Sequence, residues 1–142
     1  PFPTPCTLRQ ALTRYCDLRR PPTKRMLTAM APLVEPEVGE CIRKLLATTS
    51  AWRILQDEAV SWTQSEFWSA VGAAKLDLAA FLLHCPRQRA RPYTVASSPL
   101  ATQGRVHLCV SLVSRLAQSL ASPIANLKAL GVLPADASVP ER

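Results

Sequence analysis

The stretch RARPYTVASSP, residues 89–99, marks the point at which the spacing of apolar residues changes. Before it, apolar side chains recur every three or four residues, which is the spacing of one helix face. After it, Val106, Leu108 and Val110 alternate with other residues, as they do along a strand with two distinct faces. The sequence therefore predicts helices followed by strands.

Two strands are predicted, over residues 93–97 and 106–113, joined by a loop that holds Pro99 and Gly104. Two strands alone do not make a stable sheet. We therefore expect them either to pack on the helices or to pair with strands absent from this chain. The expected fold class is α+β, mainly α.

Capping motifs delimit the helices predicted before residue 89. TLRQ at 7–10 and TQSE at 63–66 match the capping box, in which two side chains satisfy each other's free backbone donors. Pro36 precedes another apolar stripe, and Asp77 caps a short helix that Pro86 prevents from continuing. Beyond residue 115 helical periodicity is weak, and a loose tail is expected after Gly131.

Length and composition indicate one domain with a core, because the chain has 142 residues and 48% of them are apolar. No run of eighteen apolar residues is present, so we expect no transmembrane segment and a cytoplasmic protein, or one at the cytosolic face of a membrane if its parent carries an anchor. The net charge of +7 favours anionic partners. Nucleic acid is not expected, because the basic clusters lack interleaved aromatic residues and no nucleic-acid-binding signature is present.

Cysteine and histidine spacing argues against disulfides and metal. The five cysteines are odd in number and form no C-x-x-C pair, so we expect reduced, mostly buried thiols. His84 and His107 have no metal-ligand spacing, and no metal site is predicted.

Three stretches resemble the NADPH-dependent diflavin reductases, a family that includes microsomal NADPH-cytochrome reductase, the reductase half of nitric oxide synthase, and methionine synthase reductase. PRQRARPYTVASSP at 86–99 resembles the flavin-binding strand, whose pattern is Arg-x-Tyr-Ser followed by small residues. FPTPCTLRQALTRYCDL at 2–18 resembles the entry into the helical connecting segment, and RVHLCVSLVS at 105–114 resembles the strand after the flavin motif. The resemblance therefore covers residues 2 to 115.

The resemblance implies a FAD site. Arg91 would pair with the pyrophosphate, Tyr93 would lie against the isoalloxazine, and Thr94, in the usual place of serine, would assist hydride transfer as the catalytic residue. The full set of implied FAD-binding residues is Arg91, Pro92, Tyr93, Thr94, Cys109, Val110 and Ser111.

The resemblance also implies that the chain is divided into three regions. Residues 1–85 would be the helical connecting segment, 86–115 part of an antiparallel FAD-binding β-barrel, and 116–142 a weakly helical or loose tail. The family's next phosphate-binding run is absent, and Arg115 stands where many relatives have an aromatic residue. We therefore expect either an excerpt of a longer enzyme or a degenerate relative of it, inactive by itself.

In the whole enzyme, electrons would pass from NADPH through FAD and FMN to an acceptor protein. The expected partners are an FMN-binding or flavodoxin-like domain and the NADPH-binding domain of the same parent, which would bind the FMN and NADPH. The alternative is a non-catalytic basic helical protein-interaction module that docks an acidic partner through a basic patch. The chain's N-terminal basic cluster comprises Arg14, Arg19, Arg20, Lys24 and Arg25.

Overall fold

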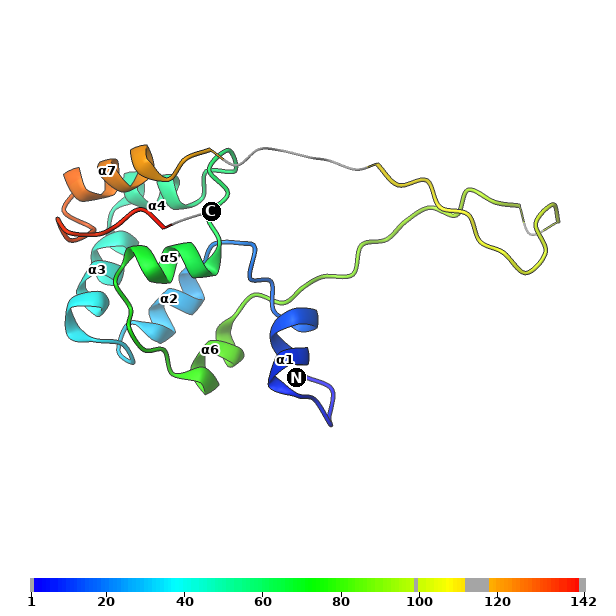
Figure 1. Cartoon of the computed structure of the whole chain (residues 1–142), viewed down its shortest axis with the longest axis horizontal. Helices are drawn as coiled ribbons and strands as arrows, with labels where there is room; N and C mark the ends of the chain where they lie inside the picture. Colours follow the sequence, from blue (N-terminus) through cyan, green and yellow to red (C-terminus); the bar gives the residue numbers. More distant parts are fainter. Residues whose placement is uncertain (1, 99, 112–117, 141–142) are drawn as a thin grey trace.

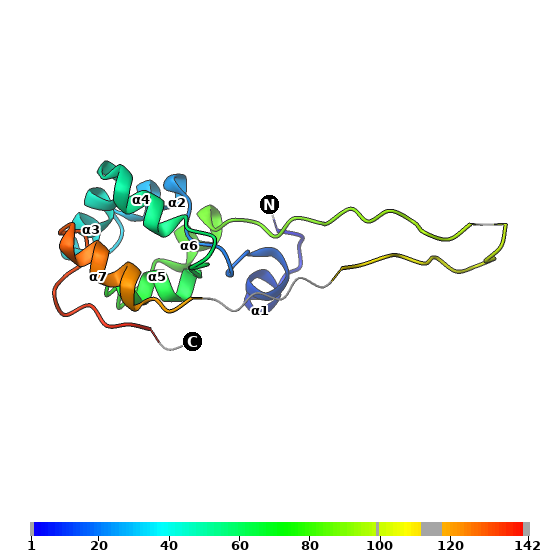
Figure 2. The ribbon, with the colours of Figure 1, turned by 90° about the horizontal axis from the view of Figure 1, so that it is seen from above.

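The computed structural model describes residues 2–98, 100–111 and 118–140. Short helices gather into a body, formed by residues 2–88 and 118–140, from which a long arm extends, formed by residues 89–98 and 100–111 (Figure 1). Viewed from above, the arm again runs away from the helices (Figure 2). The chain leaves the body after α6 and returns to it before α7.

The helical elements of the described residues are short. They are α1 (Leu8–Gln10), which continues into the π-helical turn η1 (Ala11–Tyr15), α2 (Lys24–Met30), α3 (Pro36–Ala47), α4 (Thr49–Leu55), α5 (Gln64–Ala70), α6 (Leu78–His84) and α7 (Ala121–Ala129). The longest, α3, has twelve residues. Among the helices described, none is long and apolar enough to cross a membrane.

The predicted caps are confirmed. The backbone N–H of Gln10 donates to the Thr7 hydroxyl at 3.2 Å, and the Thr7 N–H donates to the Gln10 amide oxygen at 2.9 Å. Thr63 and Glu66 repeat this reciprocal pair at 3.2 and 2.8 Å. Asp77 caps α6 by accepting a backbone hydrogen bond at 2.7 Å. Each of these side chains accepts a hydrogen bond from a backbone N–H group that the start of a helix would otherwise leave without a partner.

The core lies where the helices meet. Helix α2 packs against α3 and α6, α3 packs against α4, and α4 packs against α7. The largest fully buried side chains of the body include Met26, Leu27, Met30, Ile42, Leu45, Leu55, Trp62, Leu120, Ile124 and Val132. Val132 and Leu133 reach this core because Gly131, at φ +66°, turns the chain sharply after α7.

The predicted fold class is wrong. The described residues contain helices and two isolated β-bridges, Cys16 with Arg87 and Val95 with Leu108, but no strand and no part of a β-barrel. Within the arm, Val95 and Leu108 remain 55% and 49% exposed. Two extended segments that pack on no third strand or helix gain little from pairing, so the ladder does not extend.

Part of the predicted strand region lies outside the described residues. This applies to Pro99 in the loop, to the last positions of the second predicted strand, Leu112 and Val113, and to Arg115. The domain boundaries at residues 85 and 115 stay predictions.

Candidate functional site

A short antiparallel pairing fastens the beginning of the arm to the segment that follows η1. Two backbone hydrogen bonds flank the Cys16–Arg87 bridge: Asp17 N–H donates to the Pro86 carbonyl at 2.7 Å, and Gln88 N–H donates to the Tyr15 carbonyl at 2.9 Å. These bonds join parts of the chain that are far apart in sequence. The base of the arm is therefore positioned by the body, although the rest of the arm is not.

Arg87 has a structural role at this base. Its guanidinium lies over the ring of Phe2, 3.7 Å from the centroid, and one of its nitrogens donates to the Cys16 sulfur at 3.7 Å. Phe2 in turn meets Tyr15 edge to face, with ring centroids 6.0 Å apart. A cation over an aromatic face is attracted by the ring quadrupole, so these contacts hold Arg87 against the body.

The cysteines are free thiols with different environments. Cys16 and Cys85 are buried, Cys6 and Cys41 are half-buried, and Cys109 is exposed. Only two of the five thiols are buried, so the prediction of mostly buried thiols is wrong. Burial, together with the neighbouring Cys16 thiol, raises the pKa of Cys85 to about 12. At neutral pH the Cys85 sulfur is thus protonated and is a poor nucleophile.

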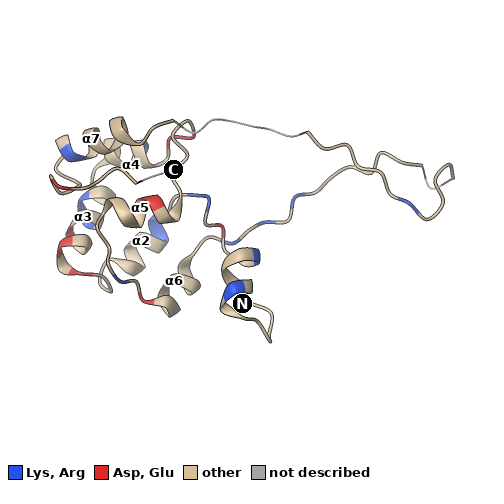
Figure 3. Cartoon of the chain, in the orientation of Figure 1, with Lys and Arg blue, Asp and Glu red and all other residues tan. Residues whose placement is uncertain are grey.

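A hollow of about 900 Å³ opens where the base of the arm meets the loop before α2. Its lining comes from two segments that are far apart in sequence, 17–23 and 86–91, and from the C-terminal end of α4. The lining residues are Asp17, Arg19, Arg20, Pro21, Thr23, Gln56, Pro86, Arg87, Gln88, Arg89 and Arg91. Basic residues mark the loop and the base of the arm in Figure 3. With five arginines and one aspartate, the lining carries a formal charge of +4.

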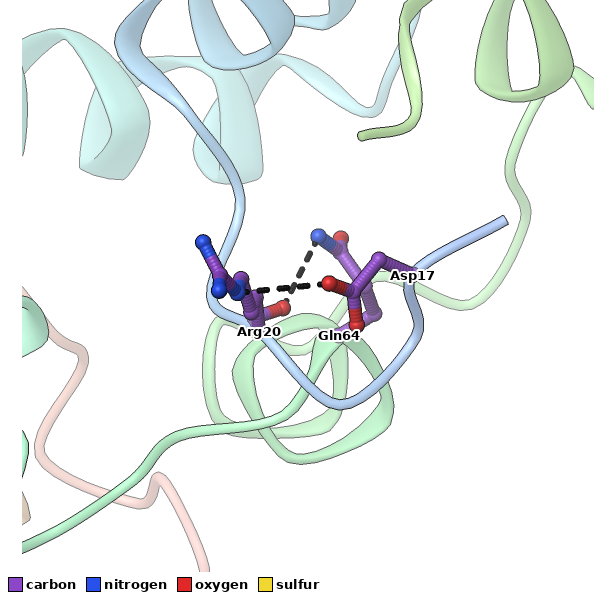
Figure 4. A network of polar contacts seen from close by, with 3 residues as sticks. All are labelled: Asp17, Arg20 and Gln64. Atoms are coloured by element: carbon purple, nitrogen blue, oxygen red, sulfur yellow. Dashed lines mark hydrogen bonds and ion pairs between the residues drawn. The ribbon is translucent and has the colours of Figure 1, made fainter. Parts of the chain in front are cut away.

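Polar contacts hold the loop of the hollow in place (Figure 4). Gln64, 2% exposed, donates through its side-chain amide to the Arg20 carbonyl at 3.1 Å. Its backbone N–H donates to the Leu18 carbonyl at 3.0 Å, and its amide oxygen accepts from the Trp68 indole at 3.1 Å. Asp17 and Arg20 form an ion pair of 3.3 Å. The loop is therefore fixed to α5 on one side and to the base of the arm on the other.

The predicted FAD-binding residues all lie on the arm and are exposed. Only Arg91 lines the hollow. The predicted residues form two blocks, 91–94 and 109–111. The Val95–Leu108 bridge lies next to both blocks, and there the Ala96 N–H donates to the His107 carbonyl at 2.8 Å. Within the described residues, no hydrogen bond, ring contact or ion pair involves the side chain of Tyr93 or Thr94.

The register of this bridge relates the two predicted blocks. In an antiparallel pair, residues that face each other have a constant sum of residue numbers, so the Val95–Leu108 register sets Thr94 opposite Cys109 and Tyr93 opposite Val110. The structure forms only the bridge itself and does not extend the ladder to these pairs.

Sequence reasoning missed the convergence of arginines in the hollow. The clusters at 19–20 and 87–91 are visible as separate basic runs. Their meeting depends on the backbone pairing around Cys16 and Arg87, for which the sequence holds no local signal.

Comparison with known proteins places most of the chain in one family. Residues 1–122 match the family described as FAD binding domain. Human NADPH–cytochrome P450 reductase is 30% identical over 128 residues, an alignment that covers 80% of this chain and 17% of the relative. Nitric oxide synthase of Anopheles stephensi is 31% identical over 117 residues, covering 80% of this chain and 9% of the relative.

A third relative is the nitric oxide synthase-like protein of Bombyx mori, 34% identical over 122 residues that cover 83% of this chain and 11% of the relative. The chain thus spans less than a fifth of the length of the relatives it matches. These findings confirm the resemblance on which the FAD prediction rests, although they test no individual site residue. The chain belongs to the FAD-binding domain family, in the group of the diflavin reductases, and FAD is the cofactor of that family.

Proposed function

We propose that this chain is the FAD-binding part of an NADPH-dependent diflavin oxidoreductase, which passes electrons from NADPH through FAD and FMN to an acceptor protein. The family match over residues 1–122 supports the FAD-binding assignment. The relatives named as an NADPH–cytochrome P450 reductase and as nitric oxide synthases support the wider reaction.

The residues of the arm fit a flavin dinucleotide chemically. Arg91, at the hollow, offers a planar guanidinium that can meet a diphosphate with two parallel hydrogen bonds. Tyr93 offers a flat apolar face, and Thr94 offers a hydroxyl that is free of other hydrogen bonds within the described residues. The observation that carries the proposal is the Val95–Leu108 bridge, because its register aligns the two blocks that would hold one ligand.

Each residue would have a distinct role. FAD supplies two-electron acceptance from NADPH and one-electron release toward FMN, while the protein supplies binding, orientation and shielding. Arg91 would hold the diphosphate, and Tyr93 would cover one face of the ring system and exclude water from it. The Thr94 hydroxyl would hydrogen-bond to the redox-active edge, the place at which charge changes during hydride transfer. The remaining contacts would come from Pro92, Cys109, Val110 and Ser111.

We also propose the partners that this reaction needs. They are an FMN-binding or flavodoxin-like domain as electron acceptor and an NADPH-binding domain as electron donor. Residues 1–85 would serve as the helical segment that connects and orients these parts.

Three alanine variants, made in the protein that carries this sequence, test the assignment. Arg91→Ala removes a charge-assisted hydrogen-bonding pair and should weaken FAD binding by roughly tenfold to a hundredfold. Thr94→Ala should leave FAD bound and slow its reduction by NADPH, as expected for an interaction made mainly in the transition state. Tyr93→Ala should lose both binding and reduction rate to intermediate degrees.

Flavin content after gel filtration and stopped-flow reduction rates are the measurements. Arg105→Ala is the matched control, because Arg105 is also exposed on the arm but does not line the hollow. If Arg91→Ala and Arg105→Ala retain FAD equally well, the assignment of Arg91 is wrong.

A further inference from the structure

Two buried cysteines lie at the base of the arm, one on each of the two paired segments. Cys16 directly follows η1, and Cys85 directly follows α6. Both side chains belong to the hydrophobic core of the body, and both are free thiols. Neither residue is among the proposed FAD contacts, so the proposed function leaves this pair of thiols without a role.

The backbone pairing sets the two cysteine side chains on one face. Cys16 is paired with Arg87, and the two backbone hydrogen bonds that flank this bridge fix the register. Side chains alternate between faces along an extended segment, so Cys85, two residues before Arg87, is a diagonal neighbour of Cys16 on the same face. The Cα atoms of such neighbours are roughly 7–8 Å apart, against about 4.4–6.8 Å across a disulfide. A small approach of the two segments therefore suffices to join the sulfurs.

The surroundings of the two sulfurs differ. A guanidinium nitrogen of Arg87 donates to the Cys16 sulfur at 3.7 Å. Burial and, after it, the interaction with the Cys16 thiol raise the pKa of Cys85 to about 12. A neighbouring cation stabilises the negative charge on a sulfur that attacks an oxidant. Cys16 is therefore suited to react first, and Cys85, which keeps its proton at neutral pH, is suited to close the bond.

We propose that Cys16 and Cys85 form a site of reversible oxidation, at which a disulfide fastens the base of the arm to the segment after η1. The oxidant is a small peroxide, such as hydrogen peroxide, which can enter a packed site when the base opens locally. The inference is independent of the proposed function, because no step of it involves a flavin.

The oxidation proceeds in two balanced steps. The Cys16 sulfur attacks a peroxide oxygen, the O–O bond breaks, and water leaves, so that Cys16 becomes a sulfenic acid. The Cys85 sulfur then attacks the Cys16 sulfur and the S–O bond breaks. The departing hydroxide takes the Cys85 proton and forms a second water. The two thiols thus lose two electrons in total, the peroxide gains them, and a dithiol reductant reverses the reaction.

The disulfide would act where the arm joins the body, after α6 (Figure 1). In the reduced chain this junction is held by two backbone hydrogen bonds and by the contacts of Arg87 with Phe2 and Cys16. These contacts break whenever the two segments separate. A covalent link between positions 16 and 85 removes the state in which the segments are far apart, so it should suppress that opening.

Peptide mapping after treatment with hydrogen peroxide tests the site in the protein that carries this sequence. Remaining thiols are blocked with iodoacetamide in denaturant, and trypsin then releases Cys16 in the peptide 15–19 and Cys85 in the peptide 76–87. We expect the two peptides to be linked, with a mass two hydrogens below their sum, and dithiothreitol to separate them. Oxidation of Cys109, which is exposed on the arm, shows that the peroxide dose was sufficient.

Hydrogen exchange measures whether the link fastens the base of the arm. The backbone amides of Asp17 and Gln88 donate across the base. Oxidation should slow the exchange of both amides by about tenfold or more, because the two segments no longer separate. The Ala96 amide, which donates to His107 within the arm, is the internal control and should exchange at an unchanged rate.

Cys41→Ser is the matched control variant, because Cys41 is a half-buried thiol of α3 that lies on neither paired segment. It should preserve the linked peptide and the slowed exchange, whereas Cys16→Ser should abolish both. If Cys16→Ser fails to fold, the mapping of the unaltered protein still decides. Complete oxidation of Cys109 without any linked peptide, or a linked peptide with unchanged amide exchange at the base of the arm, would overturn the proposal.

Discussion

Most large apolar residues of the body are buried or half-buried, whereas those that the structure describes on the arm are exposed. In the body, residues such as Leu27, Ile42 and Leu45 are at most 1% exposed. On the arm, six large apolar residues are between 45% and 92% exposed: Tyr93, Val95, Leu100, Val106, Leu108 and Val110. The difference shows that an apolar pattern alone does not bury a segment, which also needs a surface to pack against.

The backbone explains why the two regions differ. A helix satisfies its backbone hydrogen bonds within one segment, so the body needs only side-chain packing between helices. An extended segment depends on a neighbour for the same bonds. The arm finds such a neighbour at its base and at the Val95–Leu108 bridge.

The largest expected contrast between the regions is in stability. Leu45→Ala opens a cavity in the core at a side chain that is 1% exposed and should lower the free energy of unfolding by about 2–5 kcal/mol. The same change at Leu108, which is 49% exposed, should alter it by less than about 0.5 kcal/mol. Urea unfolding followed by circular dichroism measures both. Similar losses for the two variants would mean that the arm is packed in solution.

A smaller contrast is expected between two glycines. A Cβ added at Gly39 in α3 would lie 2.6 Å from the Ala31 carbonyl oxygen, so Gly39→Ala forces α2 and α3 apart and should cost about 1–3 kcal/mol. A Cβ added at Gly104 on the arm would meet no neighbouring atom within 4 Å, although the φ of +71° at this position strains any other residue. Gly104→Ala should therefore leave the unfolding of the body unchanged. A stable Gly39→Ala variant would contradict the close approach of the two helices.

The smallest expected effect concerns pH. Because the pKa of Cys85 is raised to about 12 in the folded chain, the unfolded chain loses this proton first, near pH 8.5. The folded state then binds more protons, so stability should fall as the pH rises from about 8.5 to 12, by less than about 1 kcal/mol at pH 9. Thermal unfolding between pH 7 and pH 9 measures the slope.

Cys85→Ala should flatten that slope, whereas Cys109→Ser on the exposed arm is the control and should preserve it. A slope that survives in Cys85→Ala would show that another group of the body is responsible.

Short continuous stretches of the sequence determined where helices begin and to which family the chain belongs. Thr7, Thr63 and Asp77 begin helices because their side chains satisfy nearby backbone donors, and such interactions span only three or four positions. The three family blocks are likewise continuous in the sequence, and the match over residues 1–122 confirms them. The individual FAD contacts that they imply stay predictions.

Only the tertiary structure showed which features arise from contacts between segments that lie far apart in the sequence. The extended runs after residue 89 predict strands, yet the described residues form only a bridge there, because strand formation requires a partner that local sequence does not specify. In the same way, Arg19 and Arg89 line one hollow only because the backbone pairs around Cys16 and Arg87. Long-range pairing depends on the geometry of the whole packed body, whereas caps and helix faces depend on neighbours along the chain.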